Sequence, residues 1–294
     1  MIYILVWIAI FAVVELILFY IYSESIGFKT TQYRLVVNKY LPRKINIVML
    51  SDLHDTDLGS DNDELIKAIN DIAPDFVLLA GDMITSYMQP EYNSDITFRF
   101  LKKLVAGNKV YYGLGNHEQR YLSEPDKFPG KYKELKDYVT GLGIEFLENS
   151  CVRLDEYNCS IYGLNVPIEY YRRVVTKKLP DDFVARTLGE NDKSRLNILI
   201  AHNPDQFDIY EKWHPDVIVS GHVHGGIVGI PKLGGLISPQ LKLFPKYDFG
   251  VFEKGITKMV LGRGIGWHTL PVRINNKAEI VNIIIEGEEE RTGE

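Results

Sequence analysis

Cysteine is scarce in this sequence, which rules out a fold held together by many disulfide bonds. The 294 residues include two cysteines, Cys151 and Cys159. In a hairpin between them, Cys159 would lie opposite Leu154 and Cys151 opposite Tyr162, so the two sulfurs would be on opposite faces and could not form a bridge. We therefore expect two free, buried thiols, which indicate nothing about the redox compartment.

An excess of positive charge is also lacking, since the formal net charge is -6. Nonspecific affinity for nucleic acids comes mainly from Lys and Arg contacts to phosphates, so a general nucleic-acid binder is not expected. A nuclease with a local basic groove stays compatible with this charge. The apolar share of 46% allows a large core without any covalent staple.

Basic residues are absent from the first 22 residues, which carry a single charge at Glu15. A helix of that length rises about 33 Å, enough to cross a bilayer core of about 30 Å. A cleavable signal peptide would have a basic start, a shorter apolar run and a small-residue cleavage site, and none is obvious here. We predict an uncleaved transmembrane anchor over residues 1–24. A cleaved signal or a buried helix of a soluble protein is the alternative.

Three basic residues follow the apolar run closely enough to influence its orientation, namely Lys29, Arg34 and Lys39. The positive-inside rule then predicts a single-pass protein whose domain faces the cytoplasm. However, residues 31–40 also resemble the first strand of the domain, and the charges of a folded domain are not a loop signal.

Beyond the anchor, short apolar runs alternate with amphipathic stretches. Strands buried on both faces are expected at 45–50, 76–80, 110–114, 197–201 and 217–220. Helices are expected at 62–71, 95–106, 130–142 and 205–212, and further strands at 249–253, 258–262, 270–274 and 279–287. The alternation predicts an α/β fold, and the lack of a linker makes residues 30–290 one domain.

Polar residues follow five of the expected strands, at the carboxyl ends where ligands bind in α/β sheets. These segments are Ser51-Asp52-Leu53-His54, Gly81-Asp82, Gly115-Asn116-His117-Glu118, His202-Asn203-Pro204 and Gly221-His222-Val223-His224. One such residue alone would be more typical of a hydrogen-bonded structural side chain. Five strand ends in series indicate a shared site.

The side chains in these segments are ligands that divalent metals such as Mn, Fe or Zn accept together. His222 and His224 could reach separate metals if the backbone loops between them, which the glycines around them allow. A carboxylate such as Asp82 can bridge two metals about 3.5–4 Å apart. Such a pair stabilises both oxygens of an in-line displacement and lowers the pKa of bound water toward about 7.

The order D-x-H, G-D, G-N-H-E, H and G-H-x-H resembles the calcineurin-like metallophosphoesterases across residues 45–226. The resemblance implies a four-layer α/β/β/α sandwich of two mixed sheets, preceded here by the transmembrane helix. It implies two divalent ions, Mn, Fe or Zn, the first bound by Asp52, His54 and His224. The second would be bound by Asn116, His202 and His222, and Asp82 would bridge the two. His117 would be the catalytic residue that stabilises the transition state or protonates the leaving oxygen.

Three later segments resemble the small membrane-anchored bacterial branch of this family, which is often linked to UDP-2,3-diacylglucosamine hydrolysis. They are Ser238-Pro239, Phe244-Pro245-Lys246-Tyr247 and Gly262-Arg263-Gly264. Ile227 departs from the pattern, because a polar residue is expected there, and this bears on the substrate pocket. Arg263 and His268 are candidate substrate residues, since Arg binds phosphate bidentately. Asp55 and Glu118 are expected to orient ligand imidazoles.

The resemblance implies a binuclear-metal phosphoesterase that hydrolyses a phosphodiester or pyrophosphate bond by attack of a metal-bound hydroxide. The anchor favours a lipid-linked or nucleotide-sugar substrate at the membrane surface, as for UDP-2,3-diacylglucosamine hydrolase. The alternatives are a nucleotide or nucleic-acid phosphodiesterase and a noncatalytic metal-binding module of the same fold. The expected partners are the phosphate-ester substrate and the membrane, and no protein partner is inferred.

Overall fold

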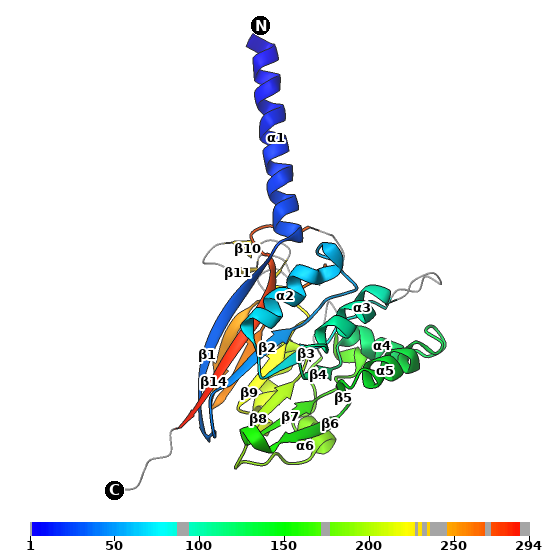
Figure 1. Ribbon diagram of the computed structural model, residues 1–294. Coiled ribbons are helices and arrows are strands. Elements are labelled where there is room, and N and C mark those ends of the chain that lie inside the picture. Colours follow the sequence, from blue (N-terminus) through cyan, green and yellow to red (C-terminus); the bar gives the residue numbers. More distant parts are fainter. Residues whose placement is uncertain are drawn as a thin grey trace.

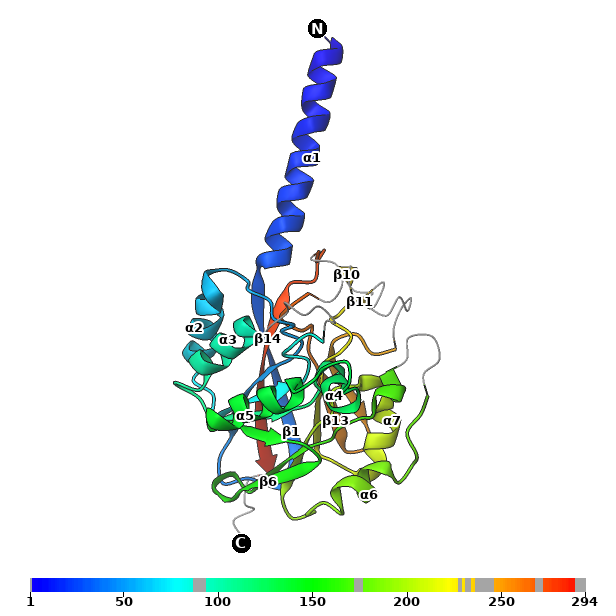
Figure 2. The same ribbon diagram turned by 90° about the vertical axis from the view of Figure 1, so that its right-hand side faces the viewer.

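The apolar runs found in the sequence form the centres of two six-stranded sheets (Figures 1 and 2). The computed structural model describes residues 2–86, 94–171, 177–226, 229–230, 234–235, 246–267 and 272–288. The first sheet has the order β1 (Phe28–Tyr40), β14 (Ala278–Glu288), β2 (Ile45–Leu50), β3 (Phe76–Ala80), β4 (Val110–Gly113) and β5 (Glu145–Leu147). β14 is antiparallel to β2, and the other neighbours are parallel.

The second sheet packs against the first and is also mixed. Its order is β12 (Gly250–Lys254), β13 (Thr257–Leu261), β9 (Val217–Ser220), β8 (Leu196–Ile200), β7 (Cys159–Gly163) and β6 (Ser150–Leu154). The outer pairs β12–β13 and β6–β7 are antiparallel hairpins, and the central pairs are parallel. A separate two-stranded ribbon joins β10 (Gly229–Ile230) to β11 (Gly234–Gly235).

Three apolar layers hold the sheets and helices together. The central layer joins the facing sides of both sheets, for example Leu78 of β3 and Ile198 of β8. An outer layer packs the first sheet against α2 (Asp63–Ile72), α3 (Asp95–Leu104) and α5 (Lys131–Gly141). The opposite layer packs the second sheet against α6 (Phe183–Leu188) and α7 (Phe207–Tyr210). The expected four-layer sandwich of two mixed sheets is therefore confirmed.

Several expected elements differ from the observed ones. The helix expected at 205–212 is only α7, flanked by short 3-10 turns at Pro204–Gln206 and Glu211–Trp213. Helix α4 (Asn116–Ser123) was not expected at all. Of the strand expected at 270–274, residues 270 and 271 lie outside the described residues, and residues 272–274 form only a single bridge, at Ile274. The buried Arg273 side chain donates hydrogen bonds to the backbone carbonyls of Asn276 and Gly266. Further 3-10 turns span Ser60–Asn62, Asp155–Tyr157 and Ile168–Tyr171.

The cysteine hairpin has the expected register, with Cys151 opposite Tyr162 and Cys159 opposite Leu154. Both thiols are free. The expectation that both are buried is wrong for Cys151, which is exposed because β6 is the edge strand of its sheet.

Helix α1 (Ile2–Ile26) projects away from the domain (Figure 1). It has 25 residues, and an 18-residue window within it reaches a mean hydropathy of 2.8 and is not buried against the protein. It is therefore a candidate membrane span, as the sequence indicated, while the boundaries 1–24 and 30–290 stay a prediction. Lys29, Arg34 and Lys39 lie in strand β1, so they are domain charges, and the cytoplasmic side also stays a prediction.

Candidate metal centre

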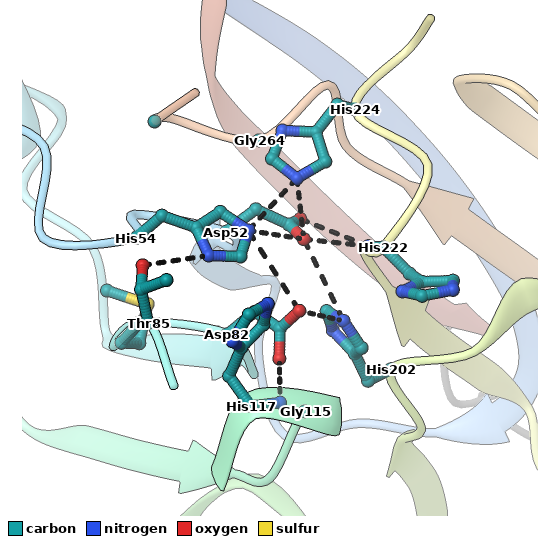
Figure 3. A network of polar contacts seen from close by, with 12 residues as sticks. Asp52, His54, Asp82, Thr85, Gly115, His117, His202, His222, His224 and Gly264 are labelled. Carbon is teal, nitrogen blue, oxygen red and sulfur yellow. Dashed lines mark hydrogen bonds and ion pairs between the residues drawn. The ribbon is translucent and has the colours of Figure 1, made fainter. Parts of the chain in front are cut away.

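Five strand ends deliver polar side chains to one cluster between the two sheets (Figure 3). Asp52 and His54 follow β2, and Asp82 follows β3. Asn116 and His117 open helix α4 directly after β4. His202 follows β8, and His222 and His224 follow β9. The structure thus brings together residues from both sheets, whose roles as ligands stay a prediction.

The loops that carry these side chains have an unusual backbone. Asp52, His54, Asp82, His222 and His224 all have a positive φ, between 48° and 77°. This left-handed region is uncommon for residues other than glycine and costs free energy. The reversals at His222 and His224 direct the two imidazoles to opposite halves of the cluster, as the sequence suggested.

One half of the cluster contains Asp52, His54 and His224. The Nε2 atoms of His54 and His224 are 3.1 Å apart. Asp52 Oδ1 lies 3.4 Å from His224 Nε2 and 3.9 Å from His54 Nε2. Ligands about 2.0–2.3 Å from one ion lie roughly this far from each other. The three side chains could therefore share one metal.

The other half contains Asp82, His202 and His222, whose ligand atoms all lie within 4.8 Å of one another. Asp82 Oδ2 is 3.1 Å from His202 Nε2 and 3.9 Å from His54 Nε2. Asp82 therefore lies between the two halves, which is the position of a bridging carboxylate. Its Oδ1 atom accepts the His117 backbone N–H at 2.7 Å and so is fixed in place.

One buried polar atom at this centre, Asn116 Oδ1, makes no hydrogen bond within the described residues. The His202 ring is held at both nitrogens. Its Nδ1 lies 2.6 Å from the Ala80 carbonyl oxygen, and its Nε2 faces Asp82 Oδ2. With Nδ1–H donating to the carbonyl, Nε2 is the ring nitrogen that a metal would take in place of a proton. Buried polar atoms normally have a partner, so this donor set fits divalent metal ions.

The carboxylates of Asp52 and Asp82 and the imidazole of His202 shift one another's pKa values. Burial raises the pKa of Asp52 to about 6. Burial would also raise the pKa of Asp82, but the nearby imidazoles of His202 and His117 hold that pKa well below its usual range. Burial alone would lower the pKa of His202, whereas the Asp82 carboxylate raises it to about 9. Metal ions would have to displace protons held here.

Glu118 holds the backbone of two loops at the centre. The expectation that it orients a ligand imidazole is therefore wrong, because its hydrogen bonds go to backbone N–H groups and to Tyr112. Its carboxylate accepts the N–H groups of Asp82, Met83 and Gly115, each at 2.9 Å. It also accepts the Tyr112 hydroxyl at 2.7 Å. One buried side chain therefore ties the loop after β3 to the loop after β4. Asp55 likewise accepts a backbone N–H, that of Thr85, at 2.9 Å.

His117 and Arg120 lie at one side of the cluster, on the first turns of α4. The backbone N–H of Ser86 donates to His117 Nδ1 at 2.8 Å. Arg120 donates to Ser86 Oγ at 3.4 Å, and within the described part of the chain no carboxylate lies within ion-pairing distance of its guanidinium. Arg120 was missed in the sequence because α4 was not expected. In a helix, residues three apart lie on the same face, so a predicted helix at 116–123 would have placed Arg120 beside His117.

The two candidate substrate residues are placed differently. Arg263 lies beside the cluster, with its guanidinium 3.4 Å from the centre of the Phe249 ring and 2.9 Å from Asn276 Oδ1. Its Nε is also 3.6 Å from Glu279 Oε1. Its role toward substrate stays a prediction. His268 lies outside the described residues. Tyr171, in contrast, packs edge-on against His222 with ring centres 5.0 Å apart, and so walls the second half of the cluster.

Comparisons with known proteins agree with this geometry. Residues 45–226 match the family described as calcineurin-like phosphoesterase. The chain is 26% identical over 245 residues to an uncharacterized metallophosphoesterase of Helicobacter pylori, covering 82% of this chain and 59% of that protein. It is 23% identical over 267 residues to phosphodiesterase YaeI of Escherichia coli, covering 88% of each.

Two further likenesses complete the comparison. A transmembrane protein with metallophosphoesterase domain from Danio rerio is 25% identical over 288 residues, covering 87% of this chain and 57% of that protein. The crystal structure of phosphopantetheinyl hydrolase (PptH) from Mycobacterium tuberculosis aligns with a TM-score of 0.46 at 16% identity, covering 78% of this chain and 94% of the other. Because the family match spans every motif that meets at the metal centre, the chain belongs to the calcineurin-like phosphoesterases, whose members are hydrolases.

Proposed function

We propose that this protein hydrolyses phosphodiester or pyrophosphate bonds with the help of two divalent metal ions. The observation that carries the proposal is the pairing of two groups of ligand atoms around Asp82. Asp52, His54 and His224 form the first, and Asp82, His202 and His222 form the second. The buried Asn116 Oδ1 atom, which has no hydrogen-bond partner within the described residues, supports the same assignment.

The first ion would be held by Asp52, His54 and His224, and the second by Asn116, His202 and His222, with Asp82 between them. Manganese, iron or zinc would suit this mixture of oxygen and nitrogen donors. When bound, such ions supply Lewis-acid activation of water and neutralise charge on the phosphoryl oxygens.

His117 is proposed to act on the substrate directly. Because Nδ1 accepts the Ser86 N–H, the neutral ring carries its proton on Nε2. That Nε2–H can donate a hydrogen bond to a phosphoryl or leaving oxygen. Arg120, which has no carboxylate partner in the described structure, is placed to bind a phosphate oxygen on the same side.

The substrate is proposed to be lipid-linked or a nucleotide sugar, such as UDP-2,3-diacylglucosamine, because α1 would confine the protein to a membrane. The test is a turnover screen of the metal-loaded full-length protein with bis(p-nitrophenyl) phosphate, a phosphomonoester, UDP-2,3-diacylglucosamine and cyclic nucleotides. Turnover that is lost in Asp82→Asn would support the proposal. Turnover of cyclic nucleotides alone would favour the nucleotide phosphodiesterase alternative. Turnover of none of them, with both metals bound, would favour a noncatalytic module.

A further inference from the structure

The metal cluster lies at the same edge of the domain at which α1 enters it. Thr31 of β1 pairs with Val281 of β14, which pairs with Met49 of β2. Because β14 is parallel to β1 and antiparallel to β2, moving toward the start of β1 means moving toward the end of β2. Asp52, three residues after Met49, is therefore about level with Phe28, three residues before Thr31.

Because of this register, the cluster lies close to the end of α1 along the direction of the strands. Strand β1 begins at Phe28, and α1 ends at Ile26. Figure 1 shows the consequence, since β1 and β14 run downward from the base of α1 and β2 runs back toward it. The catalytic edge faces the helix, and the opposite edge of the sheet faces away from it.

The end of α1 is also fixed to the domain by its own contacts. Ser25 is buried, with 4% of its surface exposed. Its Oγ accepts the backbone N–H of Arg273 at 3.0 Å, and its carbonyl oxygen accepts the indole N–H of Trp267 at 3.0 Å. Glu24 lies 3.5 Å from Lys277. The helix is therefore docked and is not a loose tether.

The segment that holds α1 also packs on the metal centre. The backbone N–H of Gly266 donates to the Asp52 carbonyl at 2.7 Å. A Cβ at Gly264 would lie 2.8 Å from Asp52 Cβ, so Gly264 is in close contact with that residue. The buried Arg273 guanidinium donates to the carbonyls of Gly264 and Gly266 at 3.2 and 2.6 Å. One continuous set of contacts thus links the helix end to a predicted metal ligand.

The length of α1 places this junction at the membrane surface. Its 25 residues rise about 37 Å, whereas the bilayer core is about 30 Å thick and the whole bilayer about 40–45 Å. If the helix spans the core, its last turn lies among the lipid headgroups, and the cluster lies next to them.

We propose that the metal centre works on phosphate esters in the headgroups of lipids that share the membrane with α1. This inference rests on the phosphoesterase function proposed above and narrows its substrate to lipids of the same bilayer. A docked helix holds the centre at one height, so a headgroup can reach it without leaving the bilayer. A soluble phosphate ester gains nothing from this arrangement.

The first experiment measures how close two positions of the domain lie to the membrane surface, and it does not require enzymatic activity. Glu64 is exposed and lines, with Ile26 and Gly27, a cavity of about 280 Å³ beside the base of α1. Asp71 is exposed on the same helix α2, about 10 Å further toward the opposite edge of the sheet. A fluorophore is attached to Glu64→Cys or Asp71→Cys in a Cys151→Ser background, and the protein is reconstituted in phosphatidylcholine vesicles with headgroup-quencher lipids. Stronger quenching at position 64 is expected. Equal or weaker quenching there would overturn the proposal.

The second experiment compares lipid substrate in the same vesicles with lipid substrate in separate vesicles. Wild-type protein should cleave a lipid with a fluorogenic phosphodiester headgroup at least about tenfold faster in the same vesicles, because the shared membrane raises its effective concentration. The detached variant carries Ser25→Ala and a flexible insert of about 20 residues between Gly27 and Phe28, with a reach of about 25 Å. Its rate on lipid in separate vesicles should rise, and the ratio of the rate in the same vesicles to the rate in separate vesicles should fall.

The matched control carries Ser23→Ala and the same insert after the exposed Asp126. Within the described residues, the Ser23 hydroxyl donates to the Tyr20 carbonyl of its own helix and makes no bond to the domain, so this control should behave as wild type. Bis(p-nitrophenyl) phosphate reports the chemistry separately, and its turnover should be equal in all variants. Turnover of this soluble ester with no preference for lipids in the same vesicles would overturn the inference and leave the proposed function standing. Turnover of neither substrate would contradict the proposed function, while the depth measurement still decides the position of the centre.

Discussion

The backbone N–H of Ser86 donates a hydrogen bond to Nδ1 of His117 at 2.8 Å. An imidazole nitrogen that accepts a hydrogen bond carries no proton, so the neutral His117 ring has its proton on Nε2. The donor is a backbone group, which no side-chain substitution at position 86 removes except proline. The fold therefore selects the tautomer of His117 in a way that is independent of the Ser86 hydroxyl.

His117→Ala should keep both metal ions and lose most turnover. A positioned proton donor or acceptor is typically worth about 10²–10⁴-fold in rate. Metal content by elemental analysis and the turnover number of the same preparation check this. Ser86→Ala is the control and should keep most of the turnover, because the N–H donor remains. Loss of metal from His117→Ala with an unchanged rate per bound metal would make His117 a ligand.

Arg120→Ala should lower kcat/KM about 10–100-fold without changing metal content, because hydrogen bonds to charged groups contribute about 1.5–3 kcal/mol. Arg120→Lys should recover part of the loss, since a lysine keeps the charge without the bidentate geometry. Steady-state kinetics with a soluble phosphodiester measure this. Arg186, exposed on α6, is the matched control, and Arg186→Ala should have no effect. An equal effect of both substitutions would remove Arg120 from the site.

Gly264→Ala should destabilise the protein more than Gly143→Ala. Both glycines have a left-handed backbone, with φ of +67° and +78°. An added Cβ at Gly143 meets nothing within 4 Å, so only the backbone cost of about 1–2 kcal/mol applies. At Gly264 it would press on Asp52, and such overpacking costs about 1–3 kcal/mol more. Thermal unfolding and metal titration of both variants test this. Unchanged metal affinity in Gly264→Ala would show that the segment does not support the centre.

Metal affinity should fall as the pH is lowered from 7 to 5. The pKa of Asp52 is raised to about 6 and that of His202 to about 9 in the metal-free protein. Below these values each group holds a proton that a metal must displace, which weakens binding by about tenfold per pH unit for each displaced proton. Calorimetric titration of the metal-free protein with Mn²⁺ at three pH values measures the slope. An affinity that is constant over this range would contradict the placement of these groups as ligands.

The clustering of the candidate metal ligands could be predicted from the sequence because their arrangement follows from local rules. Carboxyl ends of parallel strands meet at one edge, so polar residues after β2, β3 and β4 had to be neighbours. The apolar runs themselves showed where the strands were, since central strands are buried on both faces. The length and hydropathy of α1 were likewise local properties of the chain.

Contacts between distant segments were decided by the tertiary structure alone. The docking of α1 depends on Ser25 meeting Arg273, 248 residues further along the chain. No periodicity in either segment encodes that meeting, because it depends on β14 returning between β1 and β2. Glu118 and Arg120 illustrate the same limit on a smaller scale. The motif that contains Glu118 was visible and Arg120 was missed, and in both cases the partners of the side chain depend on how loops from separate strands approach one another. The sequence by itself determined which residues are candidate metal ligands, because they follow strand ends that meet at one edge. The tertiary structure decided that their cluster lies at the edge of the domain where the candidate membrane span enters, because that depends on the pairing of β1, β14 and β2.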